Sequence, residues 1–148
     1  MKAPIILSTG ALALSMACAE PAHADQDRQF PLNINGQQTL VDCGRLGPRG
    51  QLTADFLGVI DSGFHGAPGR NMYTMSTTQR QPYLDRAVNA NPSFSPSYLR
   101  AVFERPYIEY AEQNTEAGRI GFLKTKIAAH GLDDTRIEAL VDACTANR

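Results

Sequence analysis

The alternation of hydrophobic and polar residues changes character at about residue 53. In residues 30–43 apolar and polar side chains alternate, and the Asn35-Gly36 pair in the middle is a strong signal for a two-residue hairpin turn. After residue 53, apolar residues recur at intervals of three and four, which is typical of one face of a helix. The pattern predicts a short N-terminal β-hairpin followed by a mainly α fold.

About five helices are expected, and each is separated from the next by a stretch that contains Gly, Pro or Asn. The fourth and fifth predicted helices are divided by Gly131, and Asp133 is placed to cap the fifth. The predicted helical segments are residues 53–63, a segment that starts at Thr78 or Pro82 and ends before residue 89, and residues 95–110, 116–130 and 133–144.

Pro106 lies inside the third of these segments. A proline removes one backbone hydrogen bond from a helix interior and can bend or break the helix. The apolar stripe from Leu99 to Tyr110 nevertheless continues through Pro106 without a change of phase. We therefore expect one kinked helix rather than two.

The N-terminal residues have the form of an export signal. Lys2 precedes the apolar segment 5–19, and the small-x-small pattern that signal peptidase recognises ends at Ala24. The apolar segment is too short to be a comfortable membrane span. We predict a cleavable signal peptide at residues 1–24 and a periplasmic or secreted mature protein.

Three cysteines are present, and the first of them, Cys18, lies within this signal peptide. Ser15 stands where a lipoprotein signal usually has Leu, so lipidation of Cys18 is the minor alternative. Cleavage after Ala24 leaves Cys43 and Cys144, which in an oxidising compartment predict one disulfide between the two ends of the domain.

Composition and charge exclude several classes of function. The whole chain has a net charge of −1 and no concentrated block of basic residues, so we expect no nucleic-acid partner. No second apolar stretch is long enough to span a membrane, and no cofactor fingerprint is present. Residues 25–148 have the length of a single domain, with no internal repeat.

Two short motifs resemble the catalytic motifs of aspartic proteases. LVDCG and VIDSG each place an Asp, a small residue and Gly after an apolar pair, so Asp42 and Asp61 would form a proton-sharing dyad. However, Cys43 occupies the position of the expected Thr or Ser, and Asp61 falls in a helical pattern, whereas that family is nearly all β. We interpret Asp42 as a turn residue and Asp61 as a helix-end residue.

The segment 63–76 is long and glycine-rich, and loops of this size are often functional or disordered. His65, Met72 and Met75 offer imidazole and thioether groups, which suit copper(I). Arg70 and Tyr73 add a charge and an aromatic side chain of the kind found at protein interfaces. The loop is therefore a candidate protein-binding loop and, alternatively, a copper site.

His130 comes just before Gly131 at a predicted helix end, where a protonated imidazole would interact favourably with the helix dipole. No activated Ser or Cys motif is present, so we name no catalytic residue and favour a non-enzymatic function. The preferred hypothesis is an exported protein-binding module, such as an immunity, inhibitor or secretion-accessory protein. The alternatives are a periplasmic copper(I) carrier and a small hydrolase that uses Asp42, Asp61 or His65.

Overall fold

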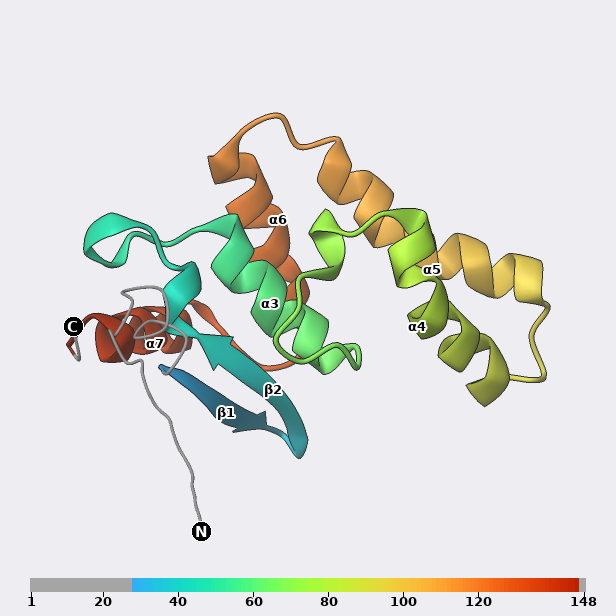
Figure 1. The fold of residues 1–148 in the computed structure, drawn as a ribbon, viewed down its shortest axis with the longest axis horizontal. Helices are drawn as coiled ribbons and strands as arrows, with labels where there is room; N and C mark the ends of the chain where they lie inside the picture. Colours follow the sequence, from blue (N-terminus) through green and yellow to red (C-terminus); the bar gives the residue numbers. More distant parts are fainter. Residues whose placement is uncertain (1–27, 147–148) are drawn as a thin grey trace, which may run out of the picture.

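The computed structural model describes residues 28–146 and confirms the predicted fold class (Figure 1). In this range five α-helices follow an N-terminal β-hairpin, and Cys43 is bonded to Cys144. Three short 3-10 helices lie in the connections. The elements are β1 (Gln29–Ile34), β2 (Gln37–Asp42), η2 (Cys43–Arg45), η3 (Pro48–Gly50), α3 (Ala54–Phe64), η4 (Met72–Thr74), α4 (Thr77–Ala90), α5 (Pro96–Ala111), α6 (Glu116–Ala128) and α7 (Asp134–Ala146).

The hairpin forms where the alternating pattern predicts it. β1 and β2 are antiparallel, and the turn between them contains Asn35 and Gly36, both with positive φ. β2 packs on α3, where the hydroxyl of Thr39 donates a hydrogen bond to the carbonyl of Ile60 at 2.7 Å. The hairpin is thus stabilised by the helix against which it packs.

α3 is the central helix, and nearly all of its residues are buried. It lies between the hairpin and α6 (Figure 1). Thr53 caps its start by accepting a hydrogen bond from the backbone N–H of Phe56. Most of its residues are apolar, which is the composition expected of a helix buried all round. Two polar side chains, Asp61 and Ser62, are nevertheless fully buried on it.

α4 and α5 lie together at the end of the molecule opposite α7 (Figure 1). α4 begins at Thr77, one residue before the earlier of the two expected starts, because Ser76 and Gln79 form a reciprocal capping box. Pro82 is therefore inside the helix and not at its start. α5 continues through Pro106, which confirms one helix rather than two.

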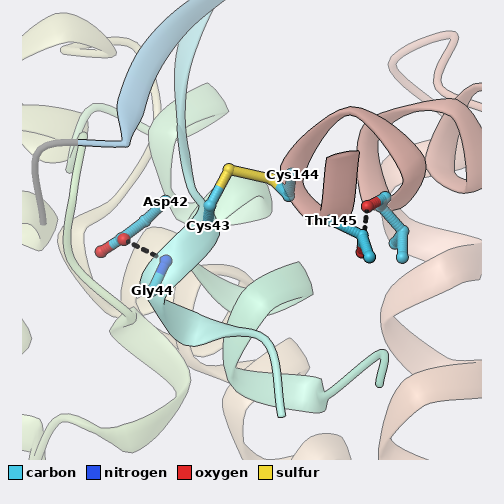
Figure 2. The surroundings of a disulfide bond; sticks show 6 residues. Asp42, Cys43, Gly44, Cys144 and Thr145 are labelled. Atoms are coloured by element: carbon cyan, nitrogen blue, oxygen red, sulfur yellow. Dashed lines mark hydrogen bonds between the residues drawn. A yellow bond between two sulfur atoms is a disulfide. The ribbon is translucent and has the colours of Figure 1, made fainter. Parts of the chain in front are cut away.

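α7 carries the second half of the disulfide (Figure 2). Asp133 accepts a hydrogen bond from the backbone N–H of Arg136, as expected of a cap. The Cα atoms of Cys43 and Cys144 are 5.4 Å apart, and the bond closes a loop with a sequence separation of 101. It ties the end of β2 to the last helix of the chain.

A buried disulfide fits an oxidising, non-cytoplasmic compartment. None of the helices within residues 28–146 is both long and apolar enough to cross a membrane. The predicted signal peptide at 1–24, and Cys18 within it, lie outside the described residues. The division into a signal peptide and a single domain stays a prediction.

Candidate functional site

Asp61 is the most unusual polar residue of the core. Its side chain is 0% exposed, on the last turns of the central helix α3. One carboxylate oxygen, Oδ2, accepts a hydrogen bond from the hydroxyl of Tyr73 at 2.6 Å. The other oxygen, Oδ1, has no hydrogen-bond partner among the described residues. A buried carboxylate oxygen without a partner is costly, so its surroundings bear on function.

His65 is the nearest cationic group to that oxygen. It lies four residues after Asp61, at the C-terminal cap of the same helix, and its Nε2 is 3.6 Å from Oδ1. The interaction with Asp61 raises the pKa of His65 above its ordinary value, and this outweighs the opposing effects of burial and of the positive charge of Lys126. The side chain of His65 is 47% exposed, so this part of the cluster faces solvent.

His130 reaches the same cluster from the connection between α6 and α7. Its ring stacks on Phe64 with the ring centroids 4.4 Å apart, and it meets the ring of His65 edge-on. Burial and the neighbouring His65 lower the pKa of His130 below its ordinary value. The expected role as a protonated group at a helix end is therefore not supported, because this environment favours the neutral imidazole.

A hydrogen bond to Gln37 on β2 orients the imidazole of His130. The distance between Nδ1 of His130 and Oε1 of Gln37 is 3.2 Å. An amide oxygen only accepts, so this contact selects the tautomer with the proton on Nδ1 and leaves the lone pair on Nε2. Metal-binding histidines are commonly oriented in this way by a partner on the other ring nitrogen.

Together, Asp61, His65 and His130 form a potential metal-binding group. One ligand atom from each residue lies within 4.8 Å of the other two. Ligand atoms on a tetrahedral Zn²⁺ are about 3.3 Å apart, given metal–ligand bonds of about 2 Å. The pair formed by Asp61 and His65 is already close to that spacing, and a rotation of the exposed His65 side chain would bring the set nearer to it.

The predicted binding loop at 63–76 is held against the body of the protein. Met72 is 0% exposed, its backbone N–H donates to the hydroxyl of Ser62, and its sulfur accepts a hydrogen bond from the hydroxyl of Tyr107 at 3.6 Å. Tyr73 is buried with its hydroxyl on Asp61. Of the other loop candidates, Arg70 is exposed and Met75 half-buried.

The two aspartates of the protease-like motifs have separate partners. Asp42 accepts hydrogen bonds from the backbone N–H of Gly44 and from the side chains of Arg45 and Gln29. Figure 2 shows the bond to Gly44 next to the disulfide. Asp42 therefore stabilises the turn after β2, as interpreted from the sequence, whereas Asp61 belongs to the histidine cluster.

Sequence reasoning missed this cluster, although one signal was present. Asp61 and His65 are four residues apart, a spacing that places two residues on one face of a helix, although the predicted helix ends at residue 63, before His65. His130 had no such signal, because its proximity depends on how α6 packs against α3. No family model, curated protein or solved structure matches the chain, so its function has to be inferred from this site itself.

Proposed function

We propose that this protein binds a divalent transition-metal ion, with Zn²⁺ as the best fit, through Asp61, His65 and His130. The observation that carries the proposal is the buried Oδ1 of Asp61, which has no hydrogen-bond partner and lies beside two imidazoles. A bound cation would compensate this carboxylate, and both histidines would coordinate the cation in their neutral form.

The donor set favours zinc over copper(I). One carboxylate oxygen and two imidazole nitrogens are ordinary zinc ligands, whereas copper(I) prefers thioether and thiolate groups. The thioether of Met72 is enclosed in the core against Tyr107, and both cysteines of the domain are oxidised. The groups beside His65 that could share a metal ion with it are a carboxylate oxygen of Asp61 and an imidazole nitrogen of His130.

Export accords with this function. The disulfide fits an oxidising compartment, and the predicted signal peptide would deliver the mature protein to the periplasm or the exterior. In such a compartment a small protein with an exposed zinc ligand can take up, buffer or hand over the ion. We propose this role in place of the copper carrier considered from the sequence.

Isothermal titration of the oxidised protein, residues 25–148, with Zn²⁺ tests the proposal. We expect one ion per chain for the unaltered protein and a loss of at least tenfold in affinity for Asp61→Asn. The asparagine keeps the shape of the side chain and an oxygen that accepts from Tyr73, so the fold is preserved. Asp142→Asn, an exposed position on α7, is the matched control and should bind zinc normally.

Two further variants distinguish the proposed zinc ligands from the methionine ligands that the sequence suggested for copper(I). His130→Ala should lose zinc affinity, because it removes one of the three ligands. Met75→Ala should keep it. Equal zinc affinity of the Asp61→Asn variant and the unaltered protein would contradict the proposal, and loss of metal binding in Met75→Ala would favour the copper-type site.

A second candidate function, binding to another protein, is supported by the surface of α5. The large apolar side chains that remain exposed in the described chain are Phe94, Tyr98, Val102 and Ile108, all on α5 or just before it. Phe94 and Tyr98 stack on each other with ring centroids 5.7 Å apart. Neighbouring apolar residues on an exposed helix are a common feature of protein-binding surfaces.

A photo-crosslinking amino acid at position 98, in cells that export the protein, tests this second function. We expect one discrete adduct when the probe replaces Tyr98 and none when it replaces Thr135, which is exposed on α7. An absence of adducts at position 98, or the same adducts at both positions, would contradict it.

A further inference from the structure

We propose that the metal ion held by Asp61, His65 and His130 keeps one coordination position open to solvent, and that this position binds an anionic oxygen ligand. The inference rests on the proposed metal site and concerns what the loaded site binds. It distinguishes a site that interacts with a ligand from one that only stabilises the fold, because structural zinc sites take all four ligands from the protein.

The protein supplies too few donor atoms to complete the coordination. Asp61 offers one oxygen, because the other accepts the hydrogen bond from Tyr73. His65 and His130 offer one nitrogen each. Among residues 28–146 no further His, Cys, Asp or Glu joins this group, and Cys43 and Cys144 are bonded to each other. A tetrahedral ion would therefore have a fourth position without a protein ligand.

The open position faces the side of the site that solvent can reach. Asp61 is completely buried at the inner side of the site, and His130 is half-buried against Phe64. His65, by contrast, has nearly half of its side chain in solvent. A water molecule or a small solute can thus approach the ion past His65.

Charge selects the class of ligand. A divalent ion with one carboxylate and two neutral imidazoles has a net charge of +1. Lys126 adds positive charge, because it lies in the last turn of α6, four residues before His130. Its nearest carboxylate, that of Glu109, is at 4.0 Å, a long distance for an ion pair. An anionic oxygen donor, from a carboxylate or a phosphate, balances this charge.

Cobalt(II) in place of zinc makes the coordination visible, because its absorption spectrum depends on the number and type of ligands. The oxidised protein, residues 25–148, is loaded with Co²⁺ and titrated in one series with acetate and in another with phosphate. Sodium perchlorate keeps the ionic strength constant. We expect a saturable spectral change with one anion bound per ion, and the responding series identifies the source of the oxygen ligand.

Two results would overturn the proposal in different ways. A cobalt spectrum that neither acetate nor phosphate alters would mean that the site binds metal but has no open position, so this inference alone would fail. An absence of any protein-bound cobalt spectrum, with no zinc binding in the calorimeter, would overturn the metal site itself and this inference with it.

Substitution of Lys126 tests the role of charge. Lys126→Gln should bind cobalt at least as tightly as the unaltered protein, because a neighbouring cation is removed, but should bind the anion several-fold more weakly. Lys124→Gln, on the same helix and paired with Asp134, is the matched control and should leave anion affinity unchanged. Equal anion affinity in both variants and the unaltered protein would contradict the argument from charge.

Discussion

The hydroxyl of Tyr73 donates a hydrogen bond to the carboxylate of Asp61 at 2.6 Å, and both residues are buried. This contact joins η4 to the last turns of α3 and orients the carboxylate so that its free oxygen lies beside His65. Burial and the negative charge of Asp61 raise the pKa of Tyr73 far above its ordinary value, so the phenol remains a donor at all physiological pH values.

Tyr73→Phe removes this donor and leaves the ring in place. We expect a loss of about 1–3 kcal/mol in the free energy of unfolding, because a buried carboxylate oxygen loses its partner. Zinc affinity should fall about tenfold or more, as is typical when a group that orients a metal ligand is removed. Urea unfolding and zinc calorimetry measure the two effects.

Tyr110→Phe is the matched control for this substitution. Tyr110 is also buried and packs against the ring of Tyr73, but the hydroxyl that donates to the carboxylate of Asp61 is that of Tyr73. Zinc affinity should be unchanged. A similar loss of zinc affinity in both variants would show that Tyr73 acts through general packing rather than through its hydrogen bond.

Gln37→Ala tests whether β2 orients His130. Without the amide oxygen, the imidazole is free to change tautomer and to rotate, so zinc affinity should fall by about tenfold. The free energy of unfolding should change little, because Gln37 is exposed. Calorimetry on this variant and on Gln38→Ala, an exposed neighbour on the same strand, decides the point, since only the first should lose affinity.

The metal-free protein should show two histidines whose pKa values are displaced in opposite directions. Histidine resonances followed by NMR should give His65 a pKa above about 6.5 and His130 one below it. The charged or titratable groups that act on His65 are Asp61 and Lys126. Those that act on His130 are His65 and Asp61. His65→Gln should raise the pKa of His130, because the charge of His65 is part of what lowers it.

These displacements also set the pH dependence of stability. The contribution of the pair between His65 and Asp61 is fully present below about pH 6.5 and is lost as the pH rises through the folded-state pKa of His65. His130 acts in the opposite sense, since its contribution is present above about pH 6.5 and is lost as the pH falls. In the His65→Gln variant, the free energy of unfolding in urea should not show the loss with rising pH that the pair between His65 and Asp61 causes.

Local patterns were sufficient to predict the architecture but not the site. The hairpin turn at Asn35-Gly36 and the cap at Thr53 are each predicted by residues that are adjacent in the sequence. The disulfide is predicted by the two cysteines that remain after signal cleavage in an oxidising compartment. The length and the glycines of the segment 63–76 predict a functional or disordered loop. The hydrogen bonds that bury it depend instead on partners from other elements, such as Ser62 and Arg80.

Arg80 holds α4, α5 and η4 together, and its loss should be costly. Its guanidinium pairs with Glu104 at 2.7 Å, donates to the carbonyls of Met72 and Met75, and lies 4.4 Å above the ring of Tyr107. Arg80→Met keeps much of the volume but leaves Glu104 and both carbonyls without their donor. We expect a loss of about 3–5 kcal/mol in the free energy of unfolding.

Arg86→Met is the control for this prediction, because Arg86 is on the same helix but exposed, with a single hydrogen bond of 3.4 Å to Gly66. The free energy of unfolding of the Arg86→Met variant should differ from that of the unaltered protein by no more than about 0.5 kcal/mol. If both variants unfold at the same urea concentration as the unaltered protein, the position of α4 and α5 does not depend on Arg80.

The disulfide should be a major source of stability. Cys43 and Cys144 are both buried, and a cross-link over this loop length contributes roughly 4–5 kcal/mol in the chain-entropy model. The double variant with Ser at both positions avoids a free thiol, and its free energy of unfolding in urea should be lower by several kcal/mol. Reducing agent should lower the stability of the unaltered protein by a similar amount and leave the double variant unchanged. A double variant as stable as the oxidised protein would mean that the contacts of β2 and α7 hold the two ends together without the bond.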